Sequence, residues 1–180
     1  GKTTTTHMIR HILKAQGHKV GVIGTVHIMI GDTSYPIHNT TPDVVDLQHI
    51  LHQMVQENVE YCVMEVSSHA LALGRVSGVE FDTAVFTNLT QDHLDFHKTF
   101  ENYLAAKCKL FKQVSAANQE KDNKGAVINI DDSYGHRVME KTTAPTITYS
   151  TLGKGTLNAS DVHMSTKNSQ YTVNYKGESY

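Results

Sequence analysis

Short apolar runs alternate with longer amphipathic segments along most of this chain. The runs that resemble strands cover 19–24, 61–66, 82–87, 125–130 and 145–149, and the segments with helical periodicity cover about 3–16, 42–57, 99–113 and 132–141. This order is typical of an α/β fold, in which a mainly parallel sheet is flanked by helices. Alternating residues at 161–165 and 170–175 add a small antiparallel portion near the C-terminus.

Local signals refine two of these segments. We expect Thr41 to cap the helix over 42–57, with Pro42 at its first position. The apolar side of that helix is expected to comprise Val44, Val45, Leu47, Ile50, Leu51 and Val55. The polar, turn-rich segment 115–124 predicts an exposed connection.

Composition limits the class of protein. With 180 residues the chain is long enough for one domain, and its net charge of −2 gives no field that would attract nucleic acid or a membrane surface. Small-molecule partners are therefore expected. Cys62 and Cys108 are far apart and form no metal-binding pair, which favours free thiols in the cytoplasm. The histidines lack metal-binding spacing, so we expect most of them not to be ligands.

The first six residues read Gly-Lys-Thr-Thr-Thr-Thr, which is the second half of a phosphate-binding loop. In such a loop a lysine neutralises the β- and γ-phosphates and the next hydroxyl binds Mg²⁺, and Lys2 and Thr3 fit these roles. A helix and then a strand follow, as a phosphate loop requires. The alternative is a threonine-rich tail that contains Gly-Lys by chance. If the loop is real, the chain begins inside its own nucleotide site.

Two of the strand-like runs end in polar residues. Glu65 closes the first run, and the carboxyl ends of strands are where α/β sheets bind ligands, so Glu65 is a candidate Mg²⁺ ligand. The alternative is an edge residue that faces solvent. After Phe86 comes the polar segment 87–97, which contains His93. Its histidines and aspartates have the chemistry to bind a metal or a phosphate.

Lys107 is unusual because its helical neighbours are apolar. Tyr103 and Leu104 precede it by four and three residues, and Leu110 and Phe111 follow it by three and four. A lysine in this position either extends its amine to the surface or has a depressed pKa and takes part in chemistry. The periodicity alone favours neither.

Five segments, taken together and in order, resemble the Mur ligase family. They are residues 1–6, 39–43, 65–71, 87–95 and 103–107. Within the family they are most similar to the members that add the third residue of the peptidoglycan stem peptide. The resemblance is strong over about 1–150. It implies that 1–180 is the central ATP-binding domain, truncated at both ends, without the N-terminal domain that binds the uridine nucleotide and the C-terminal domain that binds the amino acid.

The resemblance also implies roles for individual residues. Those that would hold ATP are Gly1, Lys2, Thr3 and Thr4. Those that would bind Mg²⁺ are Thr3, Glu65, His93 and Lys107. Those that would contact the UDP-sugar peptide are Thr40, Thr41, Ser67 and Arg75. Lys107 and Lys2 would be the catalytic residues, Lys107 as a carbamate formed with CO₂. A carbamate has two oxygens that can bind Mg²⁺, whereas an ammonium would repel it.

Some positions depart from the pattern or carry no assigned role. Leu73 stands where some family members have a glutamine that helps to hold the substrate. Asn129, Asp131 and Asp132 match an Asn-x-Asp-Asp stretch of the family, but we expect a strand-to-helix turn with an acidic cap there and no catalytic role.

The reaction implied by the resemblance is ATP-dependent amide formation on UDP-MurNAc-L-Ala-D-Glu by a monomer. The D-glutamyl carboxylate would attack the γ-phosphate, and the amine of the third amino acid would then displace phosphate from the acyl phosphate. The alternatives are a related ligase, such as a folylpolyglutamate synthase or another Mur ligase, and a nucleotide-binding fragment without turnover. The fragment alone is expected to be inactive. The sequence does not separate lysine from meso-diaminopimelate as the third residue.

Overall fold

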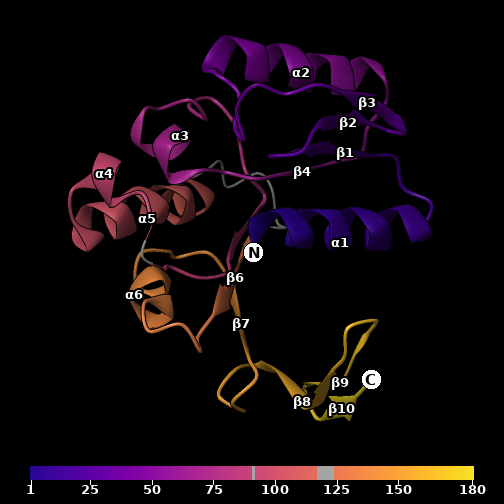
Figure 1. The fold of residues 1–180 in the computed structure, drawn as a ribbon, viewed down its shortest axis with the longest axis vertical. Helices are drawn as coiled ribbons and strands as arrows, with labels where there is room; N and C mark the ends of the chain where they lie inside the picture. Colours follow the sequence, from indigo (N-terminus) through magenta and orange to yellow (C-terminus); the bar gives the residue numbers. More distant parts are fainter. Residues whose placement is uncertain (91, 117–123) are drawn as a thin grey trace. The chain divides into compact units, whose positions relative to one another are not determined.

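The predicted strands and helices occur in the predicted order, and short elements that were not predicted lie between them (Figure 1). The computed structural model describes residues 1–90, 92–116 and 124–180. Two compact units, Gly1–Val79 and Glu80–Tyr180, make up the chain.

The first unit contains a four-stranded sheet in the order β3-β2-β1-β4. Its strands are β1 (Val20–Ile23), β2 (Ile28–Ile30), β3 (Thr33–Tyr35) and β4 (Tyr61–Met64). Strands β1 and β4 are parallel, with Ile23 opposite Met64, so both end at the same edge of the sheet. The strands predicted over 19–24 and 61–66 are confirmed. The hairpin of β2 and β3 was not predicted.

Helices α1 (Lys2–Ala15) and α2 (Val44–Gln56) lie on opposite faces of this sheet (Figure 1). Leu47 and Met54 are the buried residues of α2. A Cβ at Gly21 would lie 2.6 Å from the sulfur of Met54, so the missing side chain lets α2 approach β1 closely. A third, short helix, α3 (Ser68–Ala72), follows β4.

The start and the apolar face of α2 differ from the prediction. Asp43, not Thr41, is the N-cap, because Thr41 is buried and its hydroxyl bonds to other parts of the unit. Val45 is 76% exposed and Val55 is 67% exposed. The stripe that contacts the sheet is therefore narrower than the apolar pattern indicates.

The second unit contains a six-stranded sheet in the order β10-β9-β8-β7-β6-β5. Its strands are β5 (Thr83–Phe86), β6 (Gly125–Asn129), β7 (Thr146–Ser150), β8 (Leu157–Met164), β9 (Ser169–Tyr175) and β10 (Glu178–Ser179). Strands β5 to β8 pair in parallel, and β8 to β10 pair antiparallel. This confirms the parallel strands and the antiparallel C-terminal portion.

The helices of the second unit are α4 (Leu94–His97), α5 (Phe100–Ala116) and α6 (Gly135–Met139). The core between α5, α6 and the sheet includes Phe86, Phe111, Val114, Ile128 and Val138. Helix α6 is shorter than the predicted 132–141. Of the connection predicted over 115–124, its first two residues belong to α5 and 117–123 lie outside the described residues.

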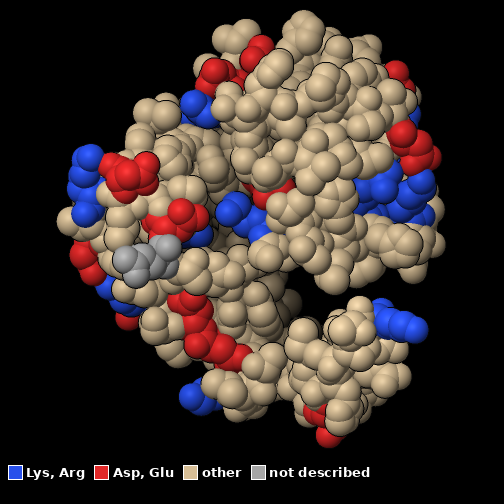
Figure 2. Space-filling model, viewed as in Figure 1, with Lys and Arg blue, Asp and Glu red and all other residues tan. Residues whose placement is uncertain are grey.

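Charges and cysteines agree with the composition. Basic and acidic side chains are interspersed on the face of the molecule that Figure 2 shows. Cys62 and Cys108 are both free thiols, as predicted. In the part of the chain that the structure describes, no helix combines the length and the apolar character needed to cross a membrane.

Candidate functional site

Glu65 lies at the carboxyl end of β4 and is only 2% exposed. The hydroxyl of Thr3 donates to its Oε2 at 3.0 Å. The backbone N–H of Thr25 donates to Oε1 at 2.9 Å, and the Thr25 hydroxyl donates to Oε2 at 3.1 Å. The alternative in which Glu65 faces solvent is therefore wrong.

The groups that donate to this carboxylate are all uncharged. In the first unit, which the structure describes throughout, no lysine or arginine pairs with Glu65. Burial of a carboxylate is costly unless a positive charge or enough hydrogen bonds compensate for it. A hard cation beside Glu65 and the Thr3 hydroxyl would supply the missing charge, because Mg²⁺ prefers oxygen ligands of these kinds.

Gly24 and Thr25 belong to this site, although the sequence analysis did not identify them. A Cβ at Gly24 would lie 2.5 Å from Oε1 of Glu65, so only glycine leaves room for the carboxylate. The signal was present in the sequence. Gly24 directly follows β1, and the carboxyl ends of neighbouring parallel strands meet at one edge of a sheet.

Thr41 fastens the segment before α2 to the turn after β4. It is 1% exposed, and its hydroxyl donates to the backbone oxygen of Glu65 at 2.9 Å and accepts from the backbone N–H of Ser67 at 3.0 Å. The hydroxyls of Thr40 and Thr25 are 3.2 Å apart. A chain of hydrogen bonds therefore joins Thr3, Glu65, Thr25 and Thr40.

Arg75 is held against the same segment. Its Nη1 donates to the backbone oxygen of Thr41 at 3.3 Å, and its Nε lies 2.8 Å from Oδ1 of Asp43. Ser67 is the N-cap of α3, and its hydroxyl accepts from the backbone N–H of Ala70. The four residues expected to contact the substrate thus lie on connected segments of one unit.

Helix α1 brings the N-terminal residues to this edge. It begins at Lys2 with Gly1 as its N-cap, so Lys2 and Thr3 lie in its first turn, where backbone N–H groups are free to bind an anion. The Thr5 hydroxyl bonds to the backbone oxygen of Gly1, and Thr6 bonds in the same way to Thr3. The side chain of Lys2 is exposed.

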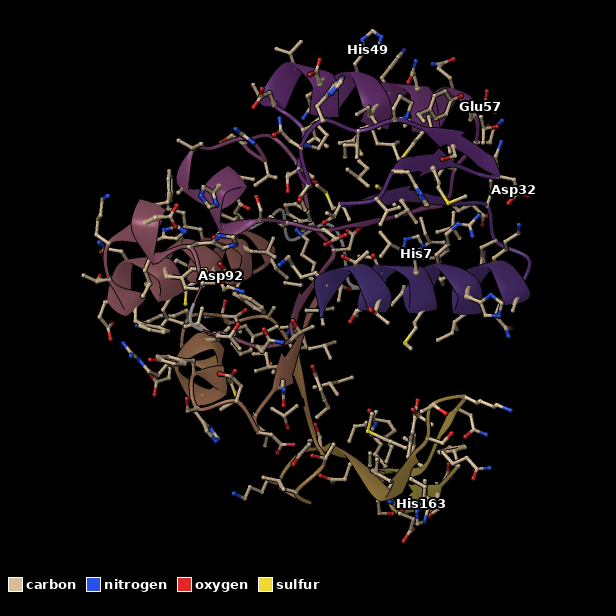
Figure 3. The ribbon with its side chains drawn as sticks, in the orientation of Figure 1. His7, Asp32, His49, Glu57, Asp92 and His163 are labelled. Atoms are coloured by element: carbon tan, nitrogen blue, oxygen red, sulfur yellow. The ribbon has the colours of Figure 1, made fainter. Side chains whose placement is uncertain are left out.

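The three histidines that Figure 3 labels lie on different elements, α1, α2 and β8. Figure 3 shows His49 pointing outward from α2 and His163 on the hairpin of the second unit. His7 points from α1 toward the sheet, where its ring meets that of His27 edge-on at 5.3 Å. Among the described residues, no group of three or more His, Cys, Asp or Glu side chains is placed to hold a metal ion.

Lys107 is half-buried on α5 in the second unit. Its Nζ donates to the backbone oxygen of Asn88 at 3.1 Å and lies 5.1 Å from the centre of the Tyr103 ring. The ring of His93 meets the same tyrosine edge-on at 6.0 Å. Lys107 and His93, both expected to bind metal, therefore flank one aromatic ring.

Tyr103 is buried beside polar groups as well as its core neighbours. His97 is buried and stacks on Tyr103 with ring centres 5.0 Å apart. Burial raises the pKa of Tyr103, and the negative charge of Asp92, which Figure 3 shows beside the α4–α5 region, raises it further. The raised pKa favours the protonated phenol, whose ring lies beside Nζ of Lys107.

The fold and the site together define a class. Parallel strands end beside a buried carboxylate, and a helix that begins with Gly-Lys-Thr places a hydroxyl on that carboxylate. This is the architecture of α/β domains that bind phosphates at the carboxyl edge of the sheet.

The chain belongs to the Mur ligase family, because the family profile described as the Mur ligase middle domain matches residues 1–180. A relative in Clostridium acetobutylicum, named UDP-N-acetylmuramoyl-L-alanyl-D-glutamate--2,6-diaminopimelate ligase 1, is 46% identical over 98% of this chain. A relative with the same activity in its name, from Geobacillus kaustophilus, is 51% identical over 91% of the chain. The chain spans 35% and 34% of the lengths of these two relatives.

Solved structures agree with this assignment. A structure named for UDP-N-acetylmuramoyl-L-alanyl-D-glutamate--2,6-diaminopimelate ligase superposes with a TM-score of 0.87 at 30% identity, over 99% of this chain and 36% of that one. The MurF ligase of Thermotoga maritima, solved with ADP, has a TM-score of 0.65 at 18% identity over 100% of this chain and 37% of its own. At this lower identity the likeness shows a shared fold.

Proposed function

We propose that residues 1–180 are the ATP-binding middle domain of a ligase that adds 2,6-diaminopimelate to UDP-MurNAc-L-Ala-D-Glu. The observation that carries the proposal is the buried carboxylate of Glu65, bonded to Thr3 and compensated by no cationic side chain of its unit. The names of the relatives at 46% and 51% identity support the substrates. Domains for the uridine nucleotide and for the amino acid would lie outside these residues, and the monomeric protein would act in the cytoplasm.

Thr3 and Glu65 of the first unit fit Mg²⁺, and for the second unit His93 and Lys107 are proposed as Mg²⁺ ligands. The fit rests on the donor chemistry: a hydroxyl and a buried carboxylate within hydrogen-bond distance of each other. Bound Mg²⁺ would neutralise the charge on the transferred phosphate. Gly1, Lys2, Thr3 and Thr4 would hold ATP through the backbone N–H groups of α1 and the ammonium of Lys2.

Lys107 is proposed to carry a carbamate. The ammonium first releases one proton to solvent. The neutral amine then attacks the carbon of CO₂, so that the Nζ–C bond forms while one C–O π bond breaks, and the nitrogen releases a second proton. The product retains one N–H, which can still donate to the oxygen of Asn88, now 3.1 Å from Nζ. The apolar neighbours of Lys107 would limit the access of water to this group.

Thr40, Thr41, Ser67 and Arg75 are proposed to position the UDP-sugar peptide. Arg75 is suited to an anionic part of that substrate because its guanidinium is already oriented by Asp43 and the backbone of Thr41. With the substrate in place, its D-glutamyl carboxylate attacks the γ-phosphate of ATP, giving ADP and an acyl phosphate. The amine of the third amino acid then attacks the acyl carbon, and phosphate leaves.

A related ligase is the second candidate, because a folylpolyglutamate synthase structure with a bound ATP analogue shares the fold at a TM-score of 0.65. A nucleotide-binding protein without turnover is the third. The main proposal predicts that ADP forms with UDP-MurNAc-L-Ala-D-Glu and 2,6-diaminopimelate. The second and third candidates predict that it does not.

The test is ADP formation by the complete protein with Mg²⁺, bicarbonate, UDP-MurNAc-L-Ala-D-Glu and either 2,6-diaminopimelate or lysine. We expect turnover with diaminopimelate, and its collapse in Lys107→Ala. Lys112→Ala is the matched control, because Lys112 is exposed on the same helix and should leave turnover intact. Turnover with neither amino acid would contradict the proposal, and full activity in Lys107→Ala would remove that lysine from the mechanism.

A further inference from the structure

The backbone oxygen that accepts from Lys107 belongs to Asn88, in the loop after β5. This loop is fastened on both sides of Asn88 by the last residue of β6 and the turn that follows it. The side-chain amide of Asn129 donates to the backbone oxygen of Thr87 at 2.8 Å. The backbone N–H of Leu89 donates to Oδ2 of Asp132 at 2.9 Å. The residues before and after Asn88 are thus each tied to a side chain of one neighbouring segment.

These two side chains are themselves fixed. Oδ1 of Asn129 accepts from the backbone N–H of Asp131 at 3.0 Å, and Oδ1 of Asp132 accepts from the backbone N–H of Tyr134 at 2.9 Å. In each side chain, Oδ1 therefore accepts a hydrogen bond within its own turn, and the other terminal atom bonds to the loop after β5. Rotation of either would break a bond within the turn as well as the bond to the loop.

Asp131, which lies between them in the sequence, has different hydrogen-bond partners. Its carboxylate accepts from the hydroxyl of Ser150 and from the backbone N–H and hydroxyl of Thr151, at the end of β7. None of these bonds reaches the loop after β5. Asp131 and Asp132 are adjacent and chemically identical, so they form a natural pair of test and control.

We propose that Asn129 and Asp132 are positioning residues for Lys107, acting through the backbone oxygen of Asn88; the proposal rests on the role proposed above for Lys107. The expected acidic turn at 129–132 is present, since Asp132 caps the N–H of Tyr134. The second hydrogen bond of Asn129 and that of Asp132 also fix the loop around Asn88. A reacting group must be held to within a fraction of an ångström, and a lysine with four rotatable bonds needs a fixed acceptor for that.

The first measurement is carbamate occupancy of the complete protein, followed by carbon-13 NMR during titration with labelled bicarbonate. Lys107→Ala identifies the signal by its loss. Loss of one hydrogen bond to the loop should raise the bicarbonate needed for half occupancy about three- to tenfold in Asp132→Asn and in Asn129→Asp. Asp131→Asn should keep the wild-type value, even where its thermal midpoint falls.

The second measurement needs no carbamate. A pulse of acetic anhydride without bicarbonate, read by mass spectrometry, gives the acetylation rate of Lys107 relative to the exposed Lys112 on the same helix. We expect this ratio to rise about three- to tenfold in Asp132→Asn and Asn129→Asp and to stay unchanged in Asp131→Asn.

The outcomes separate the two levels of the argument. Wild-type half occupancy and an unchanged acetylation ratio in Asp132→Asn and Asn129→Asp would overturn the positioning role and leave the proposed function standing. If even the wild-type protein shows no carbamate, the role proposed for Lys107 fails, and the acetylation ratio alone decides whether these residues position it. If half occupancy and the acetylation ratio change equally in Asp131→Asn, the cause is a general destabilisation of the second unit. That result would also overturn the proposal.

Discussion

Gly24 and Glu65 face each other at the carboxyl ends of β1 and β4, and a Cβ at Gly24 would lie 2.5 Å from Oε1 of Glu65. The glycine leaves the space that the buried carboxylate occupies. Thr25, the next residue, uses both its N–H and its hydroxyl to hold that carboxylate. The proposed metal site is therefore built as much by the turn after β1 as by the phosphate loop.

Gly24→Ala should displace the Glu65 carboxylate. Forcing a methyl group into this packed space costs about 1–3 kcal/mol, so both the thermal midpoint and the Mg²⁺-dependent turnover of the complete protein should fall. Gly125→Ala is the control, because its Cβ would lie 3.5 Å from the nearest atom, an ordinary contact. Equal behaviour of the two variants would contradict the account of Gly24.

Thr41→Val should loosen the turn after β4, because valine keeps the shape of threonine without its hydroxyl. The backbone oxygen of Glu65 and the N–H of Ser67 would then lose their partner, at a cost of about 1–3 kcal/mol for each buried group left unpaired. Hydrogen exchange of the Ser67 amide should quicken in Thr41→Val and stay slow in Thr41→Ser. Unchanged exchange of the Ser67 amide in Thr41→Val would show that the Thr41 hydroxyl does not stabilise this turn.

Asp131 should make the second unit sensitive to acid. Burial tends to raise the pKa of Asp131, but hydrogen bonds from Ser150 and Thr151 outweigh it and lower that pKa below its ordinary value. A lowered pKa stabilises the folded state above the unfolded value of 3.8, and this contribution is lost as the pH falls through the folded pKa. Asp131→Asn should thus be less stable than wild type near neutral pH.

The measurement is the thermal midpoint of wild type and Asp131→Asn from about pH 7 down to about pH 3. The gap between the two midpoints should narrow at the acid end of this range. Midpoints that fall in parallel would show that Asp131 does not contribute to the acid sensitivity.

The long, strongly patterned elements could be predicted from the sequence. Strands β1 and β4 to β7 lie within a residue or two of their predicted ranges, because each coincides with a short, mainly apolar run bounded by polar residues. Strands β2 and β3, of three residues each, were missed because so short a run gives no measurable period. The short helices α3 and α4 were missed for the same reason.

The site was only partly predictable. Glu65 could be found because a carboxylate at a strand end is conspicuous in the sequence. Thr41 was mistaken for a helix cap, since a threonine before proline has that local signature, whereas its hydroxyl in fact bonds to groups 24 and 26 residues away. Asn129 and Asp132 have the pattern of a turn, and nothing local reveals that they also hold the loop around Asn88. Contacts at such sequence separations depend on the register of the sheet.

The central claim is that Glu65 holds the metal that accompanies ATP. Its most direct test is calorimetric titration of the complete protein with ATP, with and without Mg²⁺, comparing wild type, Glu65→Gln and the control Glu57→Gln, which alters an exposed carboxylate paired with Lys19 (Figure 3). The account predicts that Mg²⁺ strengthens ATP binding in wild type and in Glu57→Gln. In Glu65→Gln the ratio of ATP affinities with and without Mg²⁺ should be smaller by about tenfold or more. The same Mg²⁺-dependent affinity in Glu65→Gln as in wild type would contradict it.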